Sequence, residues 1–221
     1  MALQREAAPE APVGRRERRK QEVRERILAA AEALFQRRGF EATTVDQIAE
    51  AADVAQKTFF NHFPTKQAVF EEFANGRLAV FERVVAGERQ RRASTRDRLE
   101  RTFTVMADHA AQTSELVRDL TLHMMRAQPA IGDGRSVGAA GAGREQLSTL
   151  EAAIGALLRD GQAQGDVRGD HDVAFLTELI VGAYCMIMIQ WAKDERYPVR
   201  ERLRETACFL GRAISPTEGT E

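Results

Sequence analysis

Apolar residues recur every three or four positions along most of the chain, from Val23 to Ile214, and no stretch alternates apolar and polar residues as a strand would. The pattern therefore predicts an all-α protein. The first expected helix ends before Gly39, and the second is short and begins at about residue 45. Further helices are expected over 56–63, 66–85, 144–162, 173–191 and 199–214, with two more between 94 and 127.

The stretch from Thr44 to Lys66, TVDQIAEAADVAQKTFFNHFPTK, is predicted to form two short helices joined by a tight turn, with a third following at once. Thr44 is a good N-cap, and Gln47 three residues later completes a capping box. One apolar face then carries Val45, Ile48, Ala49 and Ala52, and the second helix buries Phe59 and Phe63.

The second helix leaves a polar face outside. It consists of Gln56, Lys57, Thr58, Asn61 and His62, with Phe60 beside them. Gln and Asn can pair with adenine edges, and Lys can donate to guanine or a phosphate. Two helices with a short turn, the second bearing such a face, have the helix-turn-helix geometry that enters a major groove. The alternative is an exposed polar helix in a small bundle.

The run RILAAAEALFQRRGFEATTVDQIAEAADVAQKTFFNHFPTKQAVF, residues 26–70, resembles the N-terminal DNA-binding domain of the TetR family of transcriptional regulators. The segments GFEATTVDQIA, KTFFNHF and FPTK are in register with that family. The remaining two thirds of the chain resembles the family only in its helix layout.

The resemblance implies which residues contact DNA. The polar face and Phe60 would lie in the groove, and Thr44 and Lys66 would hold phosphates. Three positions depart from the family: Asp53 replaces Gly, Phe60 replaces Tyr, and Ala55 replaces a small capping residue worth about 1 kcal/mol. Asp can adopt the left-handed conformation at modest cost.

A basic segment precedes the first helix pattern: Arg15, Arg16, Arg18, Arg19 and Lys20. Arg19 and Lys20 are candidates for contacts with phosphates or a minor groove. The alternative is a solvated helix start that pairs locally with Glu17 and Glu22.

Composition and periodicity divide the chain into an N-terminal arm (1–14) expected to be disordered, a helix-turn-helix domain (15–66), a helical domain (67–216) and a tail (217–221). The resemblance implies that the helical domain binds a ligand and dimerises. The helix that begins near residue 66 would act as the lever between the two domains. The glycine-rich stretch 129–143 is predicted to be a flexible connector, because it lacks the Lys-Ser/Thr ending and the preceding strand of a phosphate loop.

Large, soft or amphipathic side chains in the second domain are candidates for binding a small apolar effector. They are Phe103, Met106, His109, His123, Met125, Tyr184, Met188 and Trp191. For each one, ordinary core packing is the alternative. His109 and His123 lack a carboxylate or thiol partner at ligand spacing, so no metal site and no cofactor is expected.

The helix 173–191 is apolar on nearly all sides, which suits either a membrane span or a helix between a core and a partner subunit. Polar residues interrupt it and both ends are acidic, so we expect no membrane insertion. In the family that the chain resembles, the last two helices form a four-helix dimer interface, which implies a homodimer here. A dimer in turn predicts a palindromic operator on double-stranded DNA.

The charge distribution suits a chain that docks its N-terminal end on nucleic acid, and the cysteines agree with a cytoplasmic protein. Net charge is −1, with 12 Lys/Arg against 10 Asp/Glu in residues 1–66 and 20 against 23 in the rest. Cys185 and Cys208 lie in apolar helical stretches and are predicted to be reduced and buried. The N-terminus has no signal-peptide core.

These observations predict a ligand-responsive regulator, most often a repressor in this family, that a small apolar effector releases from its operator. An activator or a ligand-independent DNA-binding regulator of the same fold is the alternative. An enzyme is not expected, because no nucleophile, base and oxyanion group cluster in the sequence.

Overall fold

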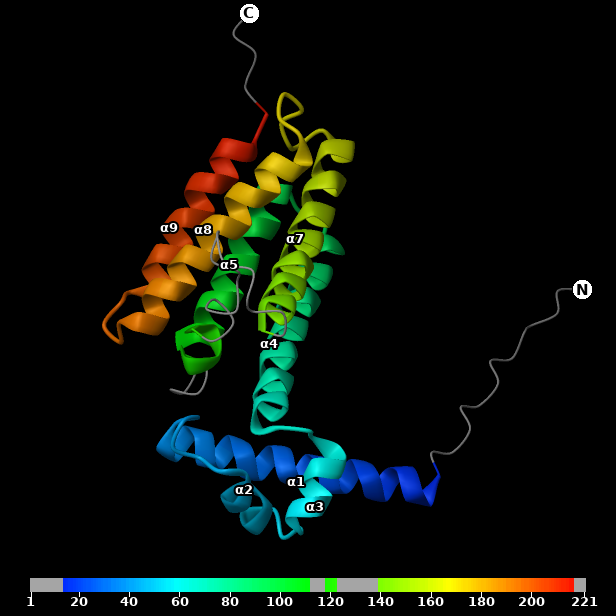
Figure 1. Cartoon of the computed structure of the whole chain (residues 1–221). Coiled ribbons are helices and arrows are strands. Elements are labelled where there is room, and N and C mark those ends of the chain that lie inside the picture. The colour runs from blue at the N-terminus through cyan, green and yellow to red at the C-terminus, as the bar shows by residue number, and fades with distance from the viewer. Residues whose placement is uncertain (1–13, 112–117, 123–138, 217–221) are drawn as a thin grey trace, which may run out of the picture. The chain divides into compact units, whose positions relative to one another are not determined.

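The computed structural model describes residues 14–111, 118–122 and 139–216, and within these ranges every regular element is helical (Figure 1). The all-α prediction is confirmed. The helices are α1 (Arg15–Arg38), α2 (Val45–Ala51), α3 (Gln56–His62), α4 (Lys66–Arg89), α5 (Thr95–Ala111), α7 (Ala139–Gln164), α8 (Val173–Lys193) and α9 (Val199–Ile214). Residues 118–122 are also helical.

The chain forms two compact units, residues 1–69 and 70–221, which we call the head and the body. The division falls three residues after the boundary expected from the sequence. It lies inside α4, a continuous helix, so neither composition nor a turn residue marks it.

The head is built on α1. Ile27, Ala31, Leu34 and Phe35 form its buried stripe, as the spacing predicts. Gly39 ends the helix with a φ of 77°, a conformation that glycine adopts without steric cost. α2 packs against α1 and α3, and Phe59 of α3 is fully buried.

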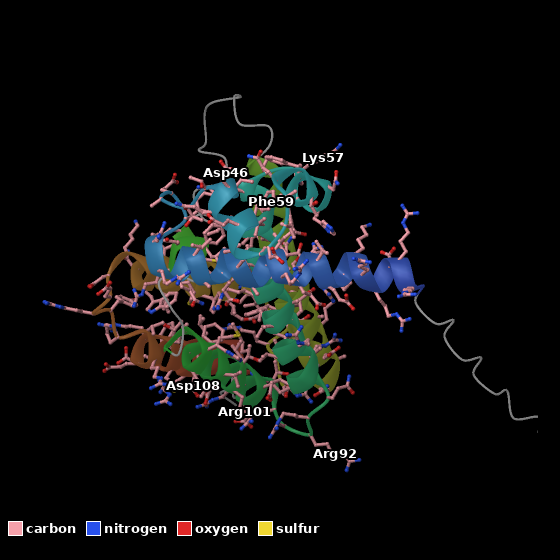
Figure 2. The ribbon with its side chains drawn as sticks, turned by 90° about the horizontal axis from the view of Figure 1, so that it is seen from below. Asp46, Lys57, Phe59, Arg92, Arg101 and Asp108 are labelled. Carbon is pink, nitrogen blue, oxygen red and sulfur yellow. The ribbon has the colours of Figure 1, made fainter. Side chains whose placement is uncertain are left out.

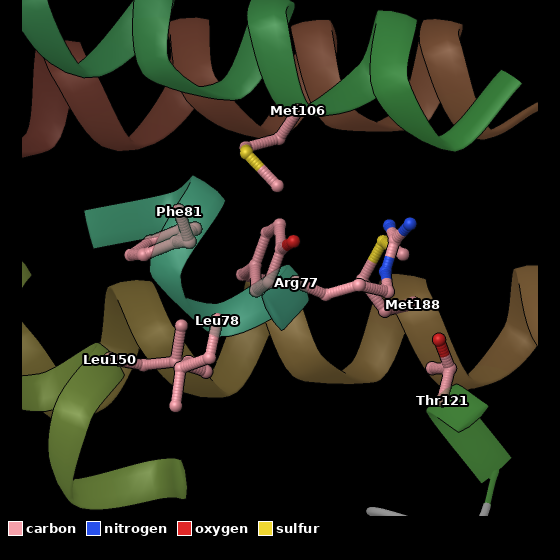
Figure 3. A pocket seen from close by; sticks show the side chains of 8 residues that line it. Arg77, Leu78, Phe81, Met106, Thr121, Leu150 and Met188 are labelled. Atoms are coloured by element: carbon pink, nitrogen blue, oxygen red, sulfur yellow. The ribbon is translucent and has the colours of Figure 1, made fainter. Parts of the chain in front are cut away.

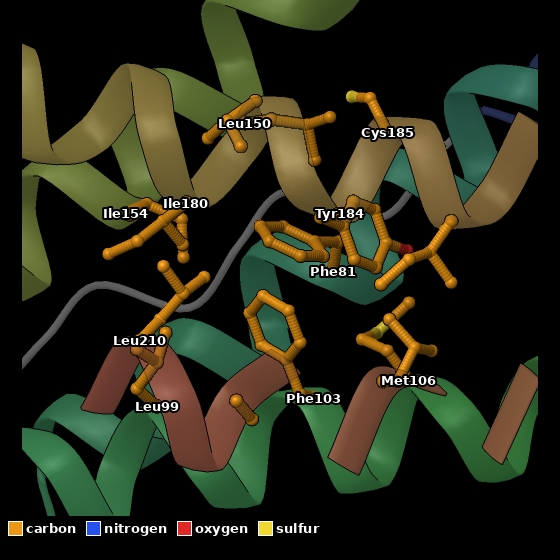
Figure 4. Packing of buried hydrophobic residues seen from close by; sticks show 14 of the residues in the cluster. Phe81, Leu99, Phe103, Met106, Leu150, Ile154, Ile180, Tyr184, Cys185 and Leu210 are labelled. Carbon is orange, nitrogen blue, oxygen red and sulfur yellow. The ribbon is translucent and has the colours of Figure 1, made fainter. Parts of the chain in front are cut away.

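In the body, α5 packs against α9, and α8 lies between α7 and α9 (Figure 1). Three aromatic rings meet in the core (Figure 4). The Tyr184 centroid lies 5.4 Å from that of Phe81 and 5.7 Å from that of Phe103. This core therefore joins α4, α5 and α8.

The prediction of a connector over 129–143 is wrong at its end, because α7 begins at Ala139. Three of the five residues 139–143 are alanine, which has the highest helix propensity and outweighs the two glycines once a helix continues beyond them. Residues 129–138, the arm 1–13 and the tail 217–221 lie outside the described residues.

Both cysteines are free thiols, as predicted, but only Cys185 is buried and Cys208 is partly exposed. Burial, with a smaller contribution from Glu151, raises the pKa of the Cys185 thiol to about 11. Cys185 is therefore protonated at neutral pH and unreactive, because the thiolate is the nucleophile.

Candidate functional site

The start of α2 is fixed by a reciprocal cap. The Gln47 N–H donates to Thr44 Oγ1 at 3.3 Å, and the Thr44 N–H donates to Gln47 Oε1 at 3.1 Å. The predicted capping box is confirmed. Thr44 is exposed and its hydroxyl oxygen accepts in this cap, so the hydroxyl proton can donate to a phosphate.

The turn between α2 and α3 places Asp53 at a φ of 51°, the left-handed conformation expected where the TetR family has Gly. Ala55 occupies the N-cap of α3 and makes no side-chain cap. The helix is instead held by its apolar side, where Phe59 and Phe63 are 0% and 2% exposed.

The other side of α3 is open. Lys57 points away from the helices of the head, whereas Phe59 lies among them (Figure 2). Thr58 and His62 are partly exposed. The exposed members of this face are Gln56, Lys57, Phe60 and Asn61. The sequence prediction of which residues face outward on α3 therefore matches their exposure.

Asp46 of α2 holds one of these side chains in place. Its Oδ1 accepts a hydrogen bond from Gln56 Nε2 at 2.6 Å. The amide keeps its carbonyl oxygen and a second N–H for a base. This is the donor and acceptor pair that matches an adenine edge.

The basic start of α1 lies beside the end of α3. Burial lowers the pKa of His62, and the positive charges of Lys20 and Arg24 lower it further. The Arg24 guanidinium lies 4.7 Å from the Phe63 ring centroid. Arg19 and Lys20 are exposed, and the only ion pair of Lys20 among the described residues, with Glu17, is 4.0 Å long. A positive surface therefore adjoins the polar face of α3.

Lys66 has a role that the sequence did not indicate. Its ammonium donates to the carbonyl oxygens of Phe40 at 2.6 Å and Thr43 at 2.7 Å, with Glu41 O at 3.5 Å, and lies 4.2 Å from the Phe40 ring centroid. These contacts occupy the ammonium N–H donors that would otherwise bind a phosphate. In this structure Lys66 ties the α1–α2 loop to the start of α4.

The body contains a cavity of about 60 Å³ with a largely apolar wall (Figure 3). Its lining residues are Arg77, Leu78, Phe81, Met106, Thr121, Leu150, Tyr184 and Met188. Met106, Tyr184 and Met188 were predicted to bind a ligand, and the structure brings these three together.

The other predicted ligand residues lie elsewhere. Phe103 and Trp191 are 1% and 2% exposed and belong to the core. The Arg118 guanidinium lies 4.6 Å from the centroid of a Trp191 ring. His109 is exposed on α5, and His123 and Met125 lie outside the described residues. Within the described ranges no group of His, Cys, Asp and Glu side chains could hold a metal.

Sequence analysis missed Arg77, which lines the cavity. A signal was available: Phe73, Arg77, Phe81 and Val85 are spaced by four along α4, so Arg77 interrupts an apolar stripe. A charge on the apolar side of a helix is the feature to look for.

The body also exposes an apolar stripe. Phe175, Leu179 and Met186 are 44%, 48% and 56% exposed, and with Gly182 they lie on one face of α8. On α9, Phe209 is 67% exposed. The opposite face of α8 is buried against its neighbours in the body. In the part of the chain that is described, α8 alone is long and apolar enough to cross a membrane, a test that core helices of soluble proteins also pass.

Comparison with known proteins agrees with the helix-turn-helix interpretation of the head. Residues 27–73 match the family model described as bacterial regulatory proteins, tetR family. The chain is 43% identical over 63 residues to the HTH-type transcriptional regulator TcmR of Streptomyces glaucescens. That match covers 28% of this chain and 27% of TcmR.

Solved structures match over most of the chain. Thermus thermophilus FadR, a TetR-family transcriptional repressor in complex with lauroyl-CoA, is 27% identical with a TM-score of 0.68, covering 90% of this chain and 98% of that one. SmeT of Stenotrophomonas maltophilia, in complex with triclosan, is 16% identical with a TM-score of 0.71, covering 89% and 93%. The SmeT likeness shows the fold alone.

Proposed function

The chain belongs to the TetR family of transcriptional regulators, and from that premise we propose that it is a cytoplasmic homodimeric repressor released from a palindromic operator by a small effector. The observation that carries this proposal is the exposed face of α3. It presents Gln56, Lys57 and Asn61 to solvent on a helix whose other side is anchored by buried Phe59.

DNA recognition by this face needs two copies. One short helix reads only a few base pairs, each worth about 1–3 kcal/mol of discrimination. A two-fold dimer doubles that reading and requires half-sites about 34–36 Å apart. The proposed dimer surface is the apolar stripe of Phe175, Leu179, Gly182 and Met186 with Phe209, because monomers rarely expose such a patch without a partner.

An effector is supported by the cavity in the body and by the lauroyl-CoA bound to Thermus thermophilus FadR. α4 offers the coupling route. Arg77, Leu78 and Phe81 line the cavity, and Lys66 at the start of the same helix holds the α1–α2 loop. An effector that binds better to one position of α4 shifts the population toward it, by no more than its differential affinity.

Repression, rather than activation, follows Thermus thermophilus FadR, which is a repressor and is 27% identical over 90% of this chain. An activator of the same fold is the second candidate. Reporter expression in a strain that lacks this gene separates the two, because output rises on loss of a repressor and falls on loss of an activator.

The test of DNA recognition is selection of bound sequences from random duplexes at low salt, followed by footprinting on the DNA that flanks the gene. We expect an inverted repeat with half-site centres one helical turn, or a multiple of it, apart. Enrichment of single half-sites would exclude the dimer arrangement. The absence of any enriched sequence would exclude the proposed function.

A further inference from the structure

Arg77 is a charged residue in an apolar cavity. Its side chain reaches from α4 toward Met188 of α8 (Figure 3). The remaining wall is supplied by Leu78, Phe81, Met106 and Leu150, with the Thr121 and Tyr184 side chains as its other polar members.

Among the described residues, the Arg77 guanidinium has no carboxylate partner and makes no ion pair or hydrogen bond. This sets it apart from Arg89, which donates to Asp160 at 2.6 Å, and from Arg101, which donates to Glu88 at 3.3 Å. A part-buried charge without a partner lowers the stability of the fold. A charged group of this kind in a cavity is a candidate for binding a ligand of opposite charge.

The electrostatics favour an anion at this point. Burial lowers the pKa of Arg77, yet a guanidinium keeps its proton in proteins. Burial raises the pKa of Tyr184 further above its ordinary value, so its hydroxyl is neutral and can donate a hydrogen bond. The cavity thus combines a cation and a phenol donor with an apolar wall.

A second hollow limits what the rest of the ligand can be. It has a volume of about 340 Å³ and shares Leu78 with the first cavity. Its wall includes Glu71, Glu82, Asn75 and Gln146. Two carboxylates there disfavour a further negative charge. Gln146 Oε1 is buried and accepts no hydrogen bond from any residue that the structure describes.

We propose that the effector is a small apolar molecule with a single anionic oxygen group, a free carboxylic acid, whose carboxylate pairs with Arg77 and whose uncharged remainder extends along the apolar wall toward Leu78. This inference rests on the proposed function and deepens it. A receptor for a coenzyme A thioester would need a different site. In such a ligand the thioester replaces the carboxylate, and the coenzyme A part carries several phosphate charges.

The size of the cavity agrees with this ligand class. A cavity needs a volume of about 10–15 Å³ to hold one water molecule. The cavity volume of about 60 Å³ therefore holds a carboxylate and a few carbon atoms. A longer tail requires the side chains that line the cavity, such as the flexible Met106 and Met188, to move.

The test is isothermal titration calorimetry of the full-length dimer with three probes: hexanoate, its near-isosteric amide hexanamide, and hexanoyl-CoA. For the wild type we expect hexanoate to bind at least about tenfold more tightly than hexanamide, since hydrogen bonds to charged groups are the stronger ones. Hexanoyl-CoA is expected to bind no better than hexanamide.

The variant Arg77→Met removes the charge and keeps an apolar side chain, so it should bind the acid and the amide equally. Arg83→Met is the matched control, because Arg83 is an exposed arginine on the same helix and outside both cavities. It should keep the wild-type preference. Arg77→Lys should retain part of it.

A second readout does not need a ligand. Without its unpaired charge, ligand-free Arg77→Met should melt about 2–4 °C above the wild type. A lower melting temperature would mean that Arg77 stabilises the fold, and would count against a ligand role.

Equal binding of hexanoate and hexanamide by the wild type, a preference that survives in Arg77→Met, or no binding of hexanoate would each overturn the inference. Operator binding by the wild type is measured separately on a selected duplex. If that duplex is bound and the carboxylate preference is absent, only this inference fails. If no duplex is bound, the proposed function fails.

Discussion

The head and the body break the usual distribution of polar and apolar residues in opposite ways. On α3 of the head, hydrogen-bonding side chains gather on an exposed face around one exposed ring, that of Phe60. On α8 of the body, an apolar stripe lies outside, whereas Arg77 lies in an apolar cavity. Such departures are where function is expected.

The largest effect should come from the head. The double variant Lys57→Ala, Asn61→Ala removes two base-reading side chains from each of two heads, and each good contact is worth about 1–3 kcal/mol. We expect specific operator affinity to fall at least about 10³-fold, to the level of non-specific binding. Fluorescence anisotropy with operator and scrambled duplexes measures the ratio.

The matched control is Gln164→Ala, Lys193→Ala, which removes an exposed amide and an exposed amine from the body. It should keep full operator affinity. If the head variant also kept it, α3 would be an ordinary solvated helix, which is the alternative that the sequence left open.

The next effect tests the apolar stripe of the body. Leu179→Asp places a charge at the centre of the stripe, where a dimer would bury it without a partner. We expect a monomer by sedimentation velocity and a loss of operator affinity of about 10²-fold, because one head reads only one half-site.

Gln164→Asp, which introduces the same charge at an exposed position at the end of α7, should remain dimeric. A Leu179→Asp protein that remained dimeric would move the interface elsewhere on the molecule.

The two regions also differ in what the sequence could predict. The capping box of Thr44 and Gln47, the turn at Asp53 and the buried pair Phe59 and Phe63 all depend on neighbours within ten residues. Spacing predicts the capping box and the buried pair, and the resemblance implies the left-handed turn. The cavity depends on α4, α5, α7, α8 and residues 118–122, which meet only in the folded body.

α5 shows why the cavity residues could not be separated from the core. Phe103 and Met106 lie three residues apart on one helix face, and both are nearly inaccessible, at 1% and 4% exposure. Only Met106 lines the cavity. Spacing indicates which face is buried, but whether a gap remains beside a residue depends on the fit of side chains from other helices.

A smaller effect should come from Lys66, whose two possible roles give different results. As a loop clamp, its loss in Lys66→Met costs the head about 1–2 kcal/mol, because charge-assisted hydrogen bonds to Phe40 and Thr43 disappear from a part-exposed site. Faster hydrogen exchange of the α2 amides would report this.

As a phosphate ligand, Lys66 would instead contribute about one unit to the slope of log affinity against log salt. Lys57→Met is the reciprocal control: it should change DNA binding and leave the exchange rates of the head unchanged. A reduced slope with unchanged exchange in Lys66→Met would restore the phosphate role that the resemblance implies.

The smallest effect should be a pH dependence carried by His62. In the free head, burial and the charges of Lys20 and Arg24 lower its pKa, so the imidazole is neutral at pH 7. A phosphate nearby would raise that pKa, so the complex binds a proton that the free protein does not, and operator affinity rises as pH falls. Between pH 8 and pH 6 we expect about a two- to fivefold gain, absent in His62→Gln and kept in His109→Gln, whose histidine lies on α5 in the body. A wild-type affinity that fell with decreasing pH would mean that no phosphate approaches His62, and the DNA-contacting face of α3 would then end before that residue.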